Sequence, residues 1–328
     1  MVAIAARGLA RAEAAAQTLE IPQFVDDWRA LLDPDRLDAL AVAAPPDAQA
    51  EIARGALECG LHVFAEKPLA LTLDSARDLA GAAVKSGLAH AIDFNFREIA
   101  ALRKARDLLQ AKAIGPLRHV AVTWQVESFA NQARIDNWKT DRSAGGGTLS
   151  NFVSHALDYL EWLAGPITGL SARLAGMPGD GRRNDTFVSM AFQFASAAAG
   201  SLVMSAAAYR GSGHRIEFYG DDGSLVLENP KRDYMRGFVL RLASRPNDFE
   251  NIDVGAPETD LWADGRVLPS SRIARRFIDW IHGGSPAQPN FTAGLRVQSL
   301  LEDARRSHET GRWVDVSAQE VGTQEVIS

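Results

Sequence analysis

The first 94 residues alternate between apolar strand patterns and helical patterns, and this alternation limits the possible folds more than any other feature of the chain. Strands are expected at residues 2–6, 37–45, 62–68 and 88–94. Helices are expected at residues 9–20, 26–32, 46–60 and 73–86. Repeated strand–helix units build a parallel sheet with helices on both of its faces. The alternation therefore predicts a doubly wound α/β domain.

The pattern changes after about residue 115, where strand patterns follow one another with turn residues between them. These strands are expected at residues 117–127, 169–176, 186–195, 199–208, 214–220 and 223–229. Consecutive strands without intervening helices predict an antiparallel sheet. Helices are expected at 148–164, 271–283 and 292–310, and a loop at 244–260. We therefore predict two domains, an α/β domain at 1–95 and an α+β domain with a large open antiparallel sheet at 96–328.

Composition and charge exclude several classes of protein. No apolar run approaches the ~20 residues that cross a bilayer, and no basic segment followed by an apolar stretch indicates a signal peptide. Cys59 is the single cysteine, so an intrachain disulfide is impossible. The net charge is −6 and the basic residues are scattered, which argues against nucleic-acid binding. We expect a cytoplasmic protein that has neither a membrane nor a nucleic acid as partner.

The tripeptide EKP ends the strand pattern at 62–68, and its lysine is a candidate for chemistry. Lys67 stands where the strand leaves the sheet, and open α/β sheets bind ligands at the carboxyl ends of their strands. Partial desolvation there would lower the lysine pKa and allow the amine to donate a proton or hold an oxyanion. A surface lysine that caps the strand end explains the pattern equally well. Glu66 beside it is either a salt-bridge partner or a hydrogen-bond acceptor for a ribose.

The stretch GGGTLSNFVSHALDYLEWLAG, residues 145–165, joins three glycines to a helix. Glycines allow a close backbone approach or a sharp turn. Asn151 and His155 are four residues apart and share a helix face, with Asp158 one turn further. His155 is a candidate acid/base group, but the pattern alone favours a buried core histidine with Asp158 as its structural partner. The spacing of Cys, His and carboxylate residues indicates no metal site.

Asn95 and Arg97 follow the strand pattern at 88–94, at the same edge of the sheet as Lys67. They would orient a polar substrate or serve as hydrogen-bonding residues of a loop. No G-x-G-x-x-G motif occurs in residues 1–150, although that motif holds the pyrophosphate in dinucleotide-binding domains. The chain instead opens on VAIAARGLARAEAAA, which has the pattern of a second strand–helix unit.

Several segments together resemble the Gfo/Idh/MocA oxidoreductases, a family named for glucose–fructose oxidoreductase and inositol dehydrogenase. These segments are AVAAPPDAQAEIARGALECGLHVFAEKPLALT, SHALDYLEWLAG, HRIEFYGDDGSLVL and PNFTAGLRVQSLLEDARRSHETGRWVDV, in the order expected of that family. The resemblance implies a Rossmann-like domain, N-terminally incomplete here, followed by a substrate-binding and oligomerisation domain. It implies hydride transfer between NADP or NAD and a sugar, polyol or related carbonyl compound. It also implies a homodimer or homotetramer formed through the antiparallel sheet.

The resemblance assigns roles to single residues. Lys67 and His155 match the family's lysine and helix histidine, while Asn151 stands where an aspartate is usual and could only orient a substrate. The implied cofactor-binding residues are Ala6, Arg7, Pro45, Glu66, Lys67 and Arg97, and the implied substrate-binding residues are Asn95 and Trp138. A small residue followed by arginine after the strand at 2–6 suits the 2′-phosphate of NADP. Trp124 and Arg134 are further candidates for contact with a sugar ring.

Two other functions stay open at this point. The same scaffold could catalyse cofactor-independent acid/base chemistry, as a lyase or isomerase, or it could be a noncatalytic binding or assembly protein. The place of the usual first strand, central in the order 3-2-1-4-5-6, is also open. The strand at 2–6 could pair with the one at 62–66, another segment could fill the place, or the chain could be a shortened form of the enzyme.

Overall fold

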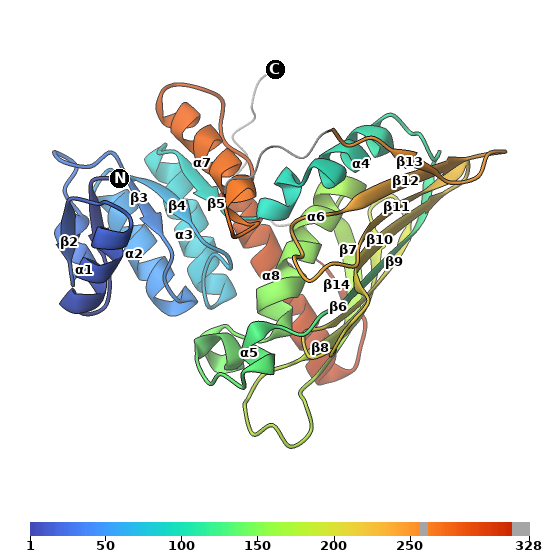
Figure 1. Ribbon diagram of the computed structural model, residues 1–328, viewed down its shortest axis with the longest axis horizontal. Coiled ribbons are helices and arrows are strands. Elements are labelled where there is room, and N and C mark those ends of the chain that lie inside the picture. Colours follow the sequence, from blue (N-terminus) through green and yellow to red (C-terminus); the bar gives the residue numbers. More distant parts are fainter. Residues whose placement is uncertain (256–261, 317–328) are drawn as a thin grey trace. The chain divides into compact units, whose positions relative to one another are not determined.

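The computed structural model describes residues 1–255 and 262–316. Contacts within the chain divide it into two units (Figure 1). The first unit comprises Met1–Asp93 together with Ala274–Gly294, and the second comprises Phe94–Ile273 and the chain from Leu295 onward. A segment from late in the sequence therefore completes the N-terminal unit.

Parallel strands form the two sheets of the first unit. β1 (Ala3–Ala5) pairs with β2 (Gln23–Val25), and β3 (Ala39–Val42), β4 (His62–Ala65) and β5 (His90–Ile92) form the other sheet in that order. This parallel pairing confirms the predicted α/β class. Both edges of β4 are occupied, by β3 and β5, so the arrangement in which the strand at 2–6 pairs with the one at 62–66 is wrong.

Local sequence determines where the helices of this unit begin and end. Within Met1–Asp93 the α-helices are α1 (Leu9–Thr18), α2 (Pro46–Glu58) and α3 (Leu73–Ser86). Pro46 occupies the first turn of α2, where its missing N–H costs no hydrogen bond. The Thr72 hydroxyl accepts the Ser75 N–H at the start of α3, and Gly87 ends that helix with φ +68°. The helix predicted at 26–32 is a short 3-10 helix, Trp28–Leu31.

The segment Ala274–Gly294 carries most of α7 (Val267–Ile281) and the start of α8 (Phe291–Thr310). The Ile92 N–H of β5 donates to the Pro289 carbonyl at 3.1 Å. Phe277 packs on Phe64 of β4, with ring centroids 5.9 Å apart. These contacts attach the late segment to the parallel sheet.

A nine-stranded sheet forms the second unit, in the order β13-β12-β11-β10-β6-β9-β8-β7-β14. Its strands are β6 (Leu117–Gln125), β7 (Ile167–Ala175), β8 (Phe187–Phe194), β9 (Ala199–Ser205), β10 (Gly213–Gly220), β11 (Gly223–Asn229), β12 (Val239–Ser244), β13 (Glu250–Ile252) and β14 (Val314–Asp315). All neighbouring pairs are antiparallel except β6 and β9. The predicted large antiparallel sheet is therefore confirmed.

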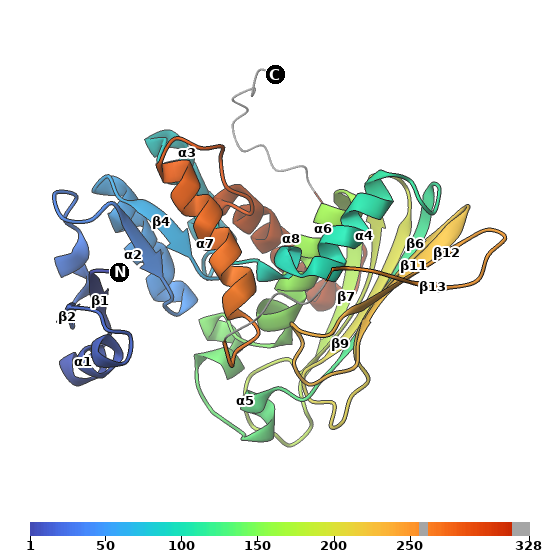
Figure 2. The same ribbon diagram turned by 45° about the horizontal axis from the view of Figure 1, so that its top comes forward.

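Helices cover one face of this sheet. α4 (Ala100–Gln110), α6 (Ser154–Ala164) and the later part of α8 lie on the same side of it (Figure 2), while α5 (Phe129–Gln132) lies in a connection after β6. Val120, Val122 and Trp124 of β6 are buried, and the residues between them are not. This alternation is that of a sheet covered on one face, and among the described residues no helix lies on the opposite face.

The loop predicted at 244–260 is only partly a loop. It contains β13, a three-residue strand of sequence Glu-Asn-Ile that pairs with β12. So short and polar a strand has no apolar alternation of its own, and the neighbouring strand determines its conformation. Residues 256–261 of the predicted loop lie outside the described residues. Every helix in the described part of the chain is too short or too polar to span a lipid bilayer.

Candidate active site

The turn after β4 presents Lys67, and a buried glutamine holds this turn. Gln49 of α2 is 1% exposed. Its Nε2 donates to the Glu66 carbonyl at 2.6 Å and to the Pro68 carbonyl at 2.8 Å, on either side of the lysine. The Glu66 carboxylate accepts the Lys67 N–H at 3.2 Å. A fixed turn at the carboxyl end of a parallel strand thus places a half-buried lysine where open α/β sheets bind ligands.

The other cofactor candidates of the first unit also follow strands. Ala6 comes directly after β1 and donates its N–H to the Val25 carbonyl at 3.2 Å. Arg7, the next residue, is exposed. Pro45 precedes α2, and its carbonyl accepts the Gln49 N–H at 2.9 Å. A small residue and an exposed guanidinium after a parallel strand fit the adenosine ribose of a dinucleotide, including a 2′-phosphate.

Two of the three glycines before α6 make contacts that a side chain would prevent. Gly147 has φ +93°, and a Cβ at this position would lie 2.3 Å from Asp185 Oδ1. A Cβ on Gly146 would lie 2.3 Å from the Trp138 carbonyl oxygen. Of the two explanations left open for this glycine run, a close backbone approach or a sharp turn, Gly146 and Gly147 therefore show the close approach.

Asp185, which is distant in sequence, binds the backbone at the start of the helical segment that leads into α6. Its Oδ2 accepts the Leu149 N–H at 2.7 Å, and its carbonyl accepts the Thr148 N–H and hydroxyl at 2.9 Å each. A π-helical turn, Leu149–Val153, follows, and α6 begins at Ser154. Burial raises the pKa of Asp185, and the hydrogen bond from Leu149 opposes that rise. The carboxylate thus caps the helix that carries the predicted site residues.

Asn151 and His155 both lie on this helical segment. The Asn151 side chain donates through Nδ2 to the Lys139 carbonyl at 2.9 Å, which orients its amide. His155 is 9% exposed and packs against Phe96 and Phe94, with ring centroids 5.0 and 5.9 Å away. The imidazole therefore has the burial expected of a core histidine, and its acid/base role stays a prediction.

Arg97 and Asp158 form a buried ion pair that the sequence did not predict. The Arg97 Nε and Nη2 donate to the two carboxylate oxygens at 2.8 and 2.5 Å. The two side chains are 14% and 1% exposed. Burial raises the pKa of Asp158, and the guanidinium opposes that rise. Asp158, which was expected to be the partner of His155, thus accepts hydrogen bonds from Arg97. This ion pair holds Arg97, a predicted cofactor residue, against α6.

The aromatic candidates differ in their exposure. Trp138 is half-buried, and the Lys139 Nζ lies 5.5 Å from its ring centroid. Trp124 is 1% exposed and stacks on His214 with centroids 4.1 Å apart. The expectation that Trp124 contacts a sugar ring is wrong, because β6 directs this side chain to the covered face of the sheet. Asn95 is 5% exposed and donates through Nδ2 to the Ser270 hydroxyl at 3.2 Å.

The predicted residues are divided between the two units. The first contains Ala6, Arg7, Pro45, Glu66 and Lys67, and the second contains Asn95, Arg97, Trp138, Asn151 and His155. Gln49 and Asp185, which support these residues, are distant from them in sequence. The AAPPDAQ segment drew attention to Gln49, and no sequence pattern indicated Asp185.

Among residues 1–255 and 262–316, no three His, Cys, Asp or Glu side chains are grouped as metal ligands.

Known protein families match both parts of the chain. Residues 1–94 match the oxidoreductase family with an NAD-binding Rossmann fold. Residues 102–226 match the GFO/IDH/MocA C-terminal domain. The first match covers the parallel sheets of the first unit, and the second covers the first part of the nine-stranded sheet.

Several proteins are similar to the chain over most of its length. An uncharacterized oxidoreductase of Synechocystis sp. is 30% identical, over 96% of this chain and 89% of that protein. D-xylose 1-dehydrogenase (NADP(+)) 2 of Haloferax volcanii is 32% identical, over 96% and 91%. The structure of levoglucosan dehydrogenase in complex with NADH and levoglucosan has a TM-score of 0.86 and 25% identity, over 97% of this chain and 91% of that one. The chain therefore belongs to the Gfo/Idh/MocA family of oxidoreductases, and its N-terminal unit is an NAD-binding Rossmann domain.

Proposed function

We propose that the protein is a sugar dehydrogenase or reductase that prefers NADP to NAD. Two similar proteins are named as dehydrogenases of xylose and levoglucosan, and we propose a substrate of this class. The main support is the turn that Gln49 holds after β4, because it presents a half-buried lysine at the ligand-binding edge of a Rossmann domain. The preference for NADP is supported by the exposed Arg7 after the small Ala6, since a guanidinium can bind a 2′-phosphate through two hydrogen bonds.

Lys67 carries the proton transfer in this proposal. When a sugar hydroxyl is oxidised, the neutral amine accepts the hydroxyl proton as the carbonyl forms. Bound nicotinamide would supply the hydride acceptor for the same carbon. In the reverse direction the ammonium returns the proton to the carbonyl oxygen. His155 assists by hydrogen bonding, and Asn151, which cannot exchange a proton, orients a substrate hydroxyl.

The remaining residues bind the two reactants. Asn95 and Trp138 contact the sugar. The residues that bind the cofactor are Ala6, Arg7, Pro45, Glu66, Lys67 and Arg97. We further propose that the protein forms a homodimer or homotetramer through the face of the nine-stranded sheet that the helices leave uncovered.

The purified protein should reduce NADP⁺ in the presence of a pentose or an anhydrosugar. Lys67→Met should lower kcat by roughly 10²- to 10⁴-fold, and this loss should exceed any rise in the Kd for NADPH. Lys85→Met is the matched control, because this lysine is exposed on α3, and it should keep the parent kcat. Arg7→Met should reduce the ratio of kcat/KM for NADP⁺ to that for NAD⁺. A parent protein inactive on all such sugars with both cofactors, or an active Lys67→Met, would refute the proposal.

A further inference from the structure

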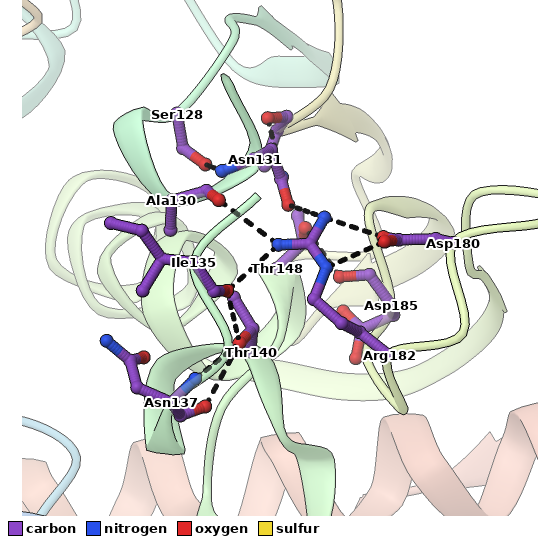
Figure 3. A network of polar contacts seen from close by, with 11 residues as sticks. Ser128, Ala130, Asn131, Ile135, Asn137, Thr140, Thr148, Asp180, Arg182 and Asp185 are labelled. Atoms are coloured by element: carbon purple, nitrogen blue, oxygen red, sulfur yellow. Dashed lines mark hydrogen bonds and ion pairs between the residues drawn. The ribbon is translucent and has the colours of Figure 1, made fainter. Parts of the chain in front are cut away.

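Arg182 contacts a polypeptide segment that leads to two of the proposed substrate residues. This 128–147 segment runs from the end of β6 to the glycines before the π-helical turn, and it carries Trp138. Arg182 comes from a different part of the chain, the connection between β7 and β8. Figure 3 shows its guanidinium directed at backbone carbonyls of the 128–147 segment.

The Arg182 guanidinium forms hydrogen bonds with α5, with a residue that follows it, and with an aspartate. The Arg182 Nη1 donates to the Ala130 and Ile135 carbonyls, at 3.1 Å each. Its Nη2 donates to the Asn131 side-chain oxygen at 3.3 Å. Its Nε and Nη2 also donate to the two carboxylate oxygens of Asp180, at 2.7 and 2.6 Å. Arg182 therefore binds three groups of the 128–147 segment while its guanidinium is held by a bidentate ion pair with Asp180.

Further hydrogen bonds lead from this point to the proposed site. The Thr140 hydroxyl donates to the same Ile135 carbonyl at 2.9 Å. The preceding residue, Lys139, accepts the Asn151 amide on its carbonyl at 2.9 Å. Trp138 stands next to it in the short helix Trp138–Thr140. A displacement of the carbonyl at 135 would therefore move both the indole and the group that orients the asparagine.

The ion pair with Asp180 holds the Arg182 guanidinium in place. Both side chains are 6% exposed, and the hydrogen bond from Arg182 lowers the pKa of Asp180, so the pairing outweighs the desolvation of the carboxylate. The planar guanidinium fixes direction as well as distance. It also satisfies carbonyls in a segment that has little regular secondary structure. We infer that Arg182 is a positioning residue, which fixes the 128–147 segment so that Trp138 and Asn151 keep the geometry needed to bind substrate.

This inference rests on the proposed function, and steady-state kinetics test it first. Arg182→Met should raise the KM for the sugar by about 10- to 100-fold. The kcat should change less than the KM does, and the KM for NADP⁺ should stay unchanged, because the contacts of Arg182 are with the 128–147 segment and Asp180. Arg182→Lys keeps the charge but loses the planar donor set, so its sugar KM should be intermediate. Arg118→Met is the control, since that side chain is 72% exposed and pairs with Asp221 outside the 128–147 segment, so its loss should leave the KM unchanged. An unchanged sugar KM in Arg182→Met, or an equal rise for sugar and cofactor, overturns the inference.

Hydrogen–deuterium exchange separates this inference from the proposed function. In the parent protein, the Ile135 N–H donates to the Ala130 carbonyl and the Thr140 N–H to the Asn137 carbonyl. Arg182→Met should speed exchange in the 128–147 segment by about tenfold and leave β6 and β9 protected. Unchanged exchange, or a uniform loss of protection in the sheet, overturns the positioning role. If Arg182→Met does not fold, the same comparison with Arg182→Lys decides. A parent protein that turns over no sugar refutes the proposed function, whereas this exchange pattern still tests how the segment is fixed.

Discussion

His214 lies among aromatic rings in the second unit, and its burial makes stability depend on pH. Its ring stacks on Trp124, and the Tyr159 hydroxyl lies 2.9 Å from its Nε2. Burial lowers the pKa of His214 from 6.5 to about 3. Between these two pH values the unfolded chain binds a proton that the folded protein does not bind. The free energy of unfolding should therefore fall as the pH is lowered through this window, by up to about 1.4 kcal/mol per pH unit, and urea unfolding at several pH values measures it.

A pair of histidine variants identifies the group responsible for this dependence. His214→Gln removes the titrating ring and should reduce the slope of unfolding free energy against pH. Some slope should remain, because burial also lowers the pKa of His62 and His90. His282→Gln changes an exposed histidine and should keep the slope of the parent protein. If the slope of His214→Gln equals that of the parent, the acid sensitivity belongs to other residues.

The glycines before α6 determine where the site helix begins. Gly147→Ala would adopt φ near the present +93° only with strain, and its Cβ would lie 2.3 Å from Asp185 Oδ1. The backbone would have to move at the start of the segment that carries Asn151 and His155. We expect a loss of about 1–3 kcal/mol in stability and a fall in kcat/KM for the sugar, measured by thermal unfolding and steady-state kinetics.

The control for this prediction separates backbone strain from steric clash. Gly283 has φ +89° and no atom within 4 Å of a Cβ built on it. Gly283→Ala should therefore lose similar stability through strain but keep the kcat/KM of the parent protein. Equal losses of activity in the two variants would mean that the contact between Gly147 and Asp185 does not position the helix.

Elements with strong local signals could be predicted from the sequence, and contacts between distant residues could not. The cap of Thr72 on Ser75 depends on residues close together in the chain, so pattern and spacing were sufficient. The strand predicted at 62–68 is present as β4, but it ends at Ala65. The supports of the candidate site depend on tertiary structure instead. Gln49 reaches a carbonyl 17 residues away, Arg97 pairs with a carboxylate 61 residues away, and Arg182 reaches a carbonyl 52 residues away. Polar side chains of this kind have many alternative partners until the fold selects one.

The uncovered face of the nine-stranded sheet is the surface through which we propose that copies of the chain associate. Its centre carries small side chains, with Ala191 of β8 opposite Ser201 of β9, and Ser201 opposite Ala121 of β6. Toward β10, Arg215 forms an ion pair with Glu217 at 2.9 Å. Small central residues allow two sheets to approach face to face at about 10 Å. A second copy of this sheet is therefore the partner that we propose for the face.

The proposed interface predicts the effect of one charge at its centre. Ala191 is exposed in the single chain, so Ala191→Arg should fold as the parent protein does. In an oligomer joined through this face, the guanidinium would be buried without a partner, which costs several kcal/mol, on the order of 3–5. Light scattering after size exclusion should therefore show a multiple of 35.4 kDa for the parent and 35.4 kDa for Ala191→Arg. Ala14→Arg makes the same substitution at an exposed position of α1 and should keep the parent mass. A monomeric parent protein would exclude the proposed association. An Ala191→Arg variant that stays oligomeric would place the association elsewhere, because no face-to-face packing of this sheet could accommodate that side chain at its centre.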